Sequence, residues 1–153
     1  MEGVGLPPTD HHFVIDPRIG VGPVHFGMHK EEVSKVFTYN YVSFFKGESC
    51  IRSDHCEVVG LIMHYDDHAR VEYIEIVKPE HGRVTLELYG TDITNFCVAK
   101  MVELLKTESP HFTSDCYGYD FPELGINLFN HDFESLDVSG NDRVECIGVS
   151  KRS

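Results

Sequence analysis

The chain has 153 residues, of which 41% are hydrophobic and 25% charged, a composition that fits one compact domain and excludes a disordered, collagen-like or coiled-coil protein. Its 13 Lys and Arg residues against 25 Asp and Glu residues give a net charge of −12, which repels nucleic-acid phosphates and anionic lipid. We therefore expect no direct binding to nucleic acid or membrane, and we expect a basic macromolecule as the partner.

Residues 1–18 contain Pro, Asp and His without a sustained hydrophobic period, and this pattern predicts an extended lead-in. The N-terminus lacks the basic start and apolar core of a signal peptide, and no stretch reaches the roughly 18 apolar residues of a membrane span. The five cysteines are an odd number without C-x-x-C spacing, which is typical of reduced thiols used in packing. Together these features predict a cytoplasmic protein.

Residues 19–90 are predicted to form a first unit, which begins with a strand and a helix. The strand covers 24–26, and Met28, Val33 and Val36 then recur near helical spacing. From residue 41 the hydrophobic period changes to two, which predicts strands over 41–45, 58–65, 71–77 and 84–88. Because the connections between these strands are too short for crossovers, the strands are predicted to be antiparallel.

Residues 91–153 are predicted to form a second unit with the same order of elements. An apolar stripe that includes Met101 and Leu105 predicts a helix over about 92–106, with Thr91 or Asp92 as its N-terminal cap. Pro110 follows the helix and marks its end. Strands are predicted after it, over 116–121, 125–129 and 144–149.

The two units are similar in sequence, and this internal repeat leads to a fold prediction. Residues 59–63 align with 124–128, and residues 70–74 align with 143–147. We therefore predict an α+β single domain in which two helix-plus-antiparallel-strand repeats, 19–90 and 91–153, form one antiparallel sheet with two helices on one face. In this sheet Ile74 and Ile76 would face the helices, and Tyr73, Glu75 and Cys146 would face away from them.

Catalytic and metal-binding patterns are not found in the sequence. His64 and His68 flank Asp66 and Asp67, but a four-residue spacing brings two histidines together only on a helix, and this segment is predicted to be a strand and a turn. There is no G-x-S-x-G elbow, no phosphate-binding loop and no H-E-x-x-H pair. We therefore predict no catalytic residue, no metal ligand and no cofactor. The alternative is a small metal-dependent hydrolase that uses the His and Asp clusters.

One run of residues carries a resemblance to known bacterial proteins. The segment from Gly20 to Val33 resembles a motif of the form I-G-P-I-x-F-G-M-x-x-x-E-V, and 59–66 and 121–129 look like its continuation. This motif is found in immunity proteins that accompany polymorphic or contact-dependent growth-inhibition toxins. The F-G-M helix start is also similar to that of the β-lactamase inhibitory protein and of an outer-membrane assembly lipoprotein, whose secretion signal and lipoprotein cysteine this chain is expected to lack. The resemblance implies a cytosolic inhibitor.

The resemblance implies an immunity protein that is not an enzyme, and the strong acidity and the lack of catalytic patterns support this expectation. It would bind a cognate toxin C-terminal domain, a basic nuclease, and would occlude the active site or substrate path of that domain. The first predicted partner-binding patch is the outward sheet face with its hairpin turn: Asp66, Asp67, Glu72, Tyr73, Glu75 and Glu87. The second is in the acidic C-terminal segment: Asp120, Glu123, Asp132 and Glu134.

Overall fold

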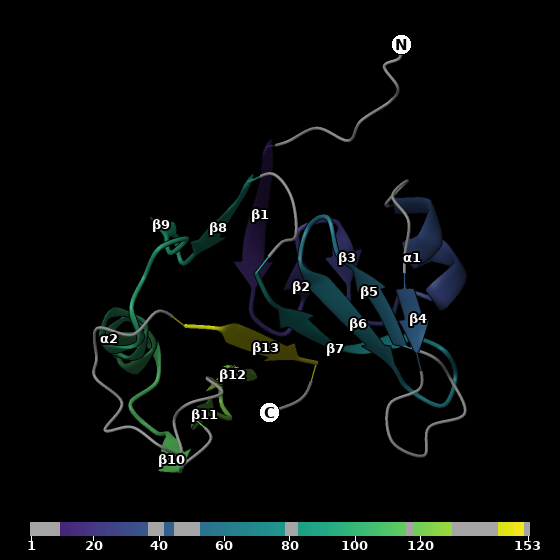
Figure 1. Ribbon diagram of the computed structural model, residues 1–153. Helices are drawn as coiled ribbons and strands as arrows, with labels where there is room; N and C mark the ends of the chain where they lie inside the picture. The colour runs from purple at the N-terminus through teal and green to yellow at the C-terminus, as the bar shows by residue number, and fades with distance from the viewer. Residues whose placement is uncertain are drawn as a thin grey trace.

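The computed structural model describes residues 10–36, 42–44, 53–78, 83–115, 118–129 and 144–151. Within these ranges the chain is mostly β-strand, arranged in two sheets with two short helices (Figure 1). No helix of the described residues has the length and hydropathy that a membrane span requires.

The smaller sheet has five strands in the order β3-β2-β1-β8-β9. Its strands are β1 (Asp10–Asp16), β2 (Gly20–Val21), β3 (Val24–His25), β8 (Arg83–Leu88) and β9 (Thr91–Asp92). At its centre β1 pairs in parallel with β8, in a register that sets Phe13 opposite Leu86 and Ile15 opposite Leu88. The chain therefore brings two segments that are distant in sequence side by side.

The larger sheet has eight strands in the order β10-β11-β12-β13-β7-β6-β5-β4, and all its neighbours are antiparallel. Its strands are β4 (Val42–Phe44), β5 (Ser53–Cys56), β6 (Leu61–Tyr65), β7 (Val71–Ile76), β10 (Thr113–Asp115), β11 (Gly118–Phe121), β12 (Ile126–Phe129) and β13 (Cys146–Ser150). The pairing of β7 with β13 joins the strands before α2 to those after it, with Ile76 opposite Ile147.

The helices α1 (Lys30–Val36) and α2 (Val98–Glu108) begin differently. At α1 the Glu32 carboxylate accepts the N–H of His29, and the His29 ring accepts the N–H of Glu31, so two free backbone donors are satisfied. At α2 the N-cap residue is Cys97, which makes no side-chain capping bond. The predicted start of this helix near residue 92 was therefore wrong, because Thr91 and Asp92 pair with β8 as strand β9.

A single apolar cluster joins both sheets and both helices. It includes Ile15 of β1, Val33 of α1, Ile74 of β7 and Leu105 of α2, all of them buried. The large sheet therefore turns one face to this core. Because side chains alternate along a strand, the residues between these core positions belong to the opposite face.

The predicted fold, a single antiparallel sheet under two helices, is corrected by this arrangement. The chain forms two sheets, and its helices of 7 and 11 residues are a small part of it. The physical reason lies in β1, which was expected to be an extended lead-in. Burial of Phe13 and Ile15 holds β1 against β8, and this parallel pairing places residues 83–88 in the smaller sheet. A pairing between two strands that are so far apart in the sequence produces no local sequence pattern from which it could be predicted.

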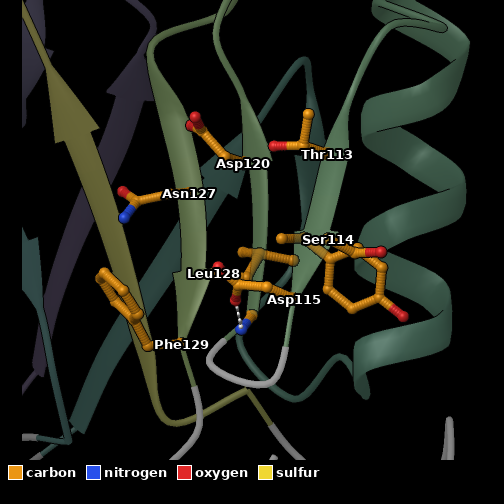
Figure 2. Close-up of a pocket in the computed structure, with 9 residues that line it drawn as sticks. Thr113, Ser114, Asp115, Asp120, Asn127, Leu128 and Phe129 are labelled. Carbon is orange, nitrogen blue, oxygen red and sulfur yellow. Dashed lines mark hydrogen bonds between the residues drawn. The ribbon is translucent and has the colours of Figure 1, made fainter.

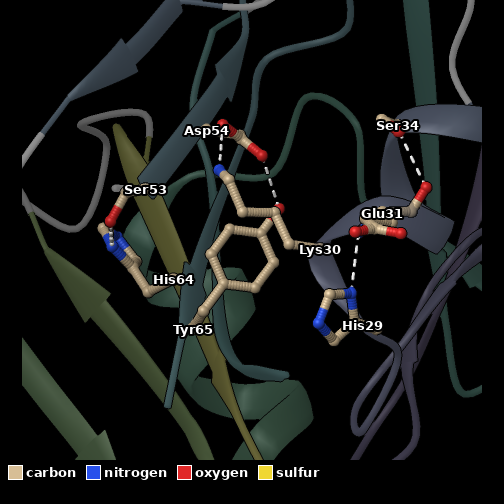
Figure 3. A network of polar contacts seen from close by, with 8 residues as sticks. All are labelled: His29, Lys30, Glu31, Ser34, Ser53, Asp54, His64 and Tyr65. Atoms are coloured by element: carbon tan, nitrogen blue, oxygen red, sulfur yellow. Dashed lines mark hydrogen bonds and ion pairs between the residues drawn. The ribbon is translucent and has the colours of Figure 1, made fainter. Parts of the chain in front are cut away.

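A buried polar cluster connects α1 to the core side of the large sheet (Figure 3). Lys30 Nζ lies 2.7 Å from Asp54 Oδ1, and the Tyr65 hydroxyl donates to Asp54 Oδ2 at 2.6 Å. The Lys30 ammonium also lies 4.7 Å from the centre of the Tyr65 ring. Asp54 is only 6% exposed, and both of these partners stabilise its buried carboxylate.

We expect Asp54→Ala to lower the free energy of unfolding by about 3 kcal/mol, because Lys30 and the buried Tyr65 hydroxyl lose their shared partner. Denaturant unfolding curves measure the change. The matched control is Asp67→Ala in the exposed turn after β6, which should stay within about 0.5 kcal/mol of the parent chain. Equal stability of the two variants would contradict a stabilising role for the cluster.

Candidate functional site

The candidate site is the face of the large sheet that points away from the core, which we call the open face. The alternation of side-chain burial along β7 shows which residues belong to the open face. Ile74 and Ile76 are buried, whereas Tyr73 and Glu75 are half-buried on the other side of the sheet. Strand register then extends this face across the neighbouring strands. The open face consists of Ser53, His55, Ile62, His64, Tyr73, Glu75, Thr113, Asp115, Gly118, Asp120, Asn127, Phe129, Cys146, Gly148 and Ser150.

Four polar side chains form a connected row on the open face. The row begins at Ser53, whose Oγ lies 2.6 Å from His64 Nδ1, as Figure 3 shows. The other ring nitrogen, His64 Nε2, lies 2.5 Å from Glu75 Oε1. The Cys146 thiol donates to Glu75 Oε2 at 3.6 Å. The row therefore runs from β5 across β6 and β7 to β13, and it fixes the Glu75 carboxylate in one place.

Tyr73 lies across the middle of the open face. Its ring stacks on His64, with ring centres 5.6 Å apart, and its hydroxyl donates to Asn127 Oδ1 at 3.3 Å. The hydroxyl can reach Asn127 because Gly148 has no side chain between them: a Cβ there would overlap both groups. Burial of the hydroxyl raises the pKa of Tyr73 well above its ordinary value, and the Glu75 charge raises it further.

A pocket opens on the same face over β10, β11 and β12 (Figure 2). Its lining includes Asp115, Asp120, Asn127 and Phe129. Asp115 accepts the N–H of Gly118 at 3.1 Å, whereas the Asp120 side chain is exposed. Phe129 is 37% exposed and is among the few large apolar side chains of the described residues that reach the surface to this extent.

Three of the predicted partner-binding residues come together on this face. Tyr73 and Glu75 belong to its centre, and Asp120 lines the pocket. The Tyr73 hydroxyl donates to Asn127, and Asn127 lies opposite Asp120 in the pairing of β11 with β12, so this contact links the centre of the face to the pocket.

The acidic residues of the β6–β7 hairpin lie at one end of the large sheet. Asp67 is exposed in the turn, and Glu72 is exposed at the start of β7. The Asp66 carboxylate accepts the backbone N–H groups of His68 and Arg70 at 2.8 and 3.0 Å. These two bonds lower the pKa of Asp66, and they hold its carboxylate within the turn that contains Asp66.

The remaining predicted residues lie elsewhere. Glu87 was expected on the same sheet face as Glu75, but it belongs to β8 of the smaller sheet, where its carboxylate lies 3.2 Å from His12 Nε2. Glu123 lies in the turn between β11 and β12, and its carboxylate accepts the Ser109 hydroxyl at 2.6 Å. Asp132 and Glu134 are outside the described residues.

Sequence reasoning missed the residues that hold this site together. His64 was considered only together with His68 as a metal ligand, but His64 is buried in β6 and His68 is exposed in the following turn. Ser53 was missed because no strand was predicted over 53–56. Asn127 could have been found, because it alternates with the apolar residues Ile126 and Leu128 in β12. In the part of the chain that the structure describes, no group of three or more metal-ligating side chains converges.

Comparisons of the chain with protein-family models, curated proteins and solved structures found no match. No relative therefore supplies a residue assignment for this site. The functional argument rests on the residues of the open face and on their charge, contacts and exposure.

The raised pKa of Tyr73 leads to a prediction about alkaline stability. In the unfolded chain this phenol ionises near its ordinary pKa of 10.0, whereas in the folded protein it ionises only at higher pH. The raised pKa therefore contributes its full stabilisation of the folded state below pH 10, and this stabilisation is lost as the pH rises further. We expect Tyr73→Phe to show a smaller loss of stability above pH 10, as measured by unfolding curves at several pH values. An unchanged alkaline slope would contradict the assignment to Tyr73.

The space over Gly148 leads to a second prediction for this site. Gly148→Ala should lower the free energy of unfolding by about 1–3 kcal/mol, because the new methyl group pushes Tyr73 and Asn127 aside. A double-mutant cycle with Tyr73→Ala tests the cause, since the alanine at 148 should cost much less once the phenol is gone. A cost that is the same in both backgrounds would place the strain elsewhere.

Proposed function

We propose that this protein is an immunity protein: it binds a basic toxin domain of nuclease type and neutralises it by covering its active site or substrate path. The observation that carries the proposal is the open face, a broad sheet surface on which acidic and aromatic groups gather. Asp120 is exposed on this face, and Tyr73 and Glu75 are half-buried there. Val33 of α1 and Met101 and Leu105 of α2 belong to the core on the opposite side.

Charge supports a basic partner. The chain carries a net charge of −12, and Glu75 and Asp120 add carboxylates at the centre and in the pocket of the open face. A nuclease has a positive surface where it holds the phosphates of its substrate. An acidic surface of matching shape is steered towards that region, and once bound it competes directly with the nucleic acid.

The rigidity of the face supports tight binding. Tyr73 is held between the His64 ring and the Asn127 amide, and Glu75 is held by His64 and Cys146. Side chains that are already fixed lose little conformational entropy when a partner docks on them. An inhibitor of this kind needs no reacting group, which agrees with the lack of catalytic patterns in the sequence and with the resemblance of the F-G-M segment to immunity proteins.

Co-expression tests the proposal in bacterial cells. The chain is produced together with the C-terminal domain encoded just upstream of its gene, and cell survival and co-purification are measured. We expect the cells to survive and the two proteins to purify as a complex of equal stoichiometry. Cell death, or survival without a complex, would overturn the proposal.

A pair of charge reversals tests which surface binds. Asp120→Lys on the open face should weaken the complex by about tenfold to a hundredfold, because it sets a positive charge against a basic partner. The control is Glu87→Lys on the smaller sheet, which should leave the dissociation constant within about twofold. If Glu87→Lys were the more harmful change, the smaller sheet would be the docking surface instead.

A further inference from the structure

We infer that the pocket over β10, β11 and β12 receives an arginine side chain of the partner. The inference rests on the proposed function, from which it takes a basic protein as the partner, and it adds the chemical group that enters the pocket. Four features of the lining support it: the floor at Gly118, the carboxylates of Asp115 and Asp120, the exposed ring of Phe129 and the lack of any basic residue among the lining residues.

Gly118 is one of the residues that line the pocket. In the register of β11 with its neighbours, Gly118 lies opposite Asp115 on one side and Phe129 on the other. A Cβ at this position would overlap the Leu128 carbonyl oxygen, so the close approach of β11 and β12 requires a glycine here. The pocket lies over this point of the sheet and is lined by residues of three strands.

The charge in this pocket is negative. Asp115 and Asp120 are diagonal neighbours on β10 and β11, a relation that sets Cβ atoms about 7 Å apart. The Asp115 carboxylate accepts a backbone bond from Gly118, and the described residues place no hydrogen-bond donor on the Asp120 carboxylate. Both aspartates line the pocket, and none of the other lining residues is basic.

The aromatic wall favours arginine as that cation. A guanidinium group is flat, stacks on aromatic rings and offers five N–H donors, so it can contact an aromatic ring such as Phe129 and a carboxylate such as Asp120. It is also more weakly hydrated than an ammonium group, which makes it easier to bring against an exposed ring. Phosphate, by contrast, would meet two negative charges here. Arginine is also a residue that nucleases use to hold phosphate, so the pocket would remove such a side chain from substrate binding.

The pocket can be tested on the protein alone with a small probe. Two-dimensional NMR spectra are recorded while N-acetyl-arginine amide is added, with N-acetyl-citrulline amide as a neutral control of the same shape. We expect saturating shifts at the amides of Gly118, Asp120 and Asn127 with a dissociation constant of about a millimolar for arginine, none for citrulline, and none in Asp120→Asn. Equal shifts with citrulline, or arginine shifts that never saturate, would overturn the inference.

The complex provides a second test that separates this inference from the proposed function. Asp120→Asn should weaken binding to the toxin domain by at least about tenfold, whereas Asp16→Asn, an exposed change on the smaller sheet, should stay within about twofold. If the parent chain binds the toxin and Asp120→Asn binds equally well, the pocket assignment fails and the function stands. If the parent chain does not bind the toxin but the pocket takes arginine, the function fails and the pocket assignment stands.

Discussion

The pairing of β7 with β13 is the interaction on which the open face depends. On the core side it sets Ile74 against Val149 and Ile76 against Ile147, and all four side chains are buried there. The same register places Gly148 opposite Glu75 on the other side of the sheet. Hydrophobic burial on one face therefore decides the geometry of the polar groups on the other, because a slip of one residue would exchange the two faces.

The open face combines two kinds of surface that have different physical roles. Around His64 the side chains hold one another and are buried or half-buried, so this half fixes the positions of Tyr73 and Glu75. Around Asp120 and Phe129 the groups are exposed, so this half supplies charge and apolar area that a partner can still desolvate. A rigid centre next to an exposed acidic pocket is consistent with the protein recognition that we propose.

The sequence predicted local features well and long-range ones poorly. The period of two identified β7 and the opposite faces of Ile74 and Tyr73, because alternation is a property of a single strand. The parallel pairing of β1 with β8 was missed, since it depends on segments far apart in the chain. The start of α2 was misplaced because an Asp and a Thr that resemble a helix cap were used in a strand instead. The row from Ser53 to Cys146 crosses four strands, and no motif of adjacent residues in the sequence predicts it.

The same β7–β13 pairing has a consequence for how the protein is made. While the chain emerges from the ribosome, β7 is complete well before β13, so its outer edge lacks this partner for nearly half of synthesis. An unpaired edge of this kind, beside the apolar residues of β6 and β7, invites association with other chains. The strand that closes the sheet also has a high sequence separation from its partner, which slows the final folding step. Chains shortened before residue 146 should therefore accumulate as aggregates, even though both helices and most strands are already present in them.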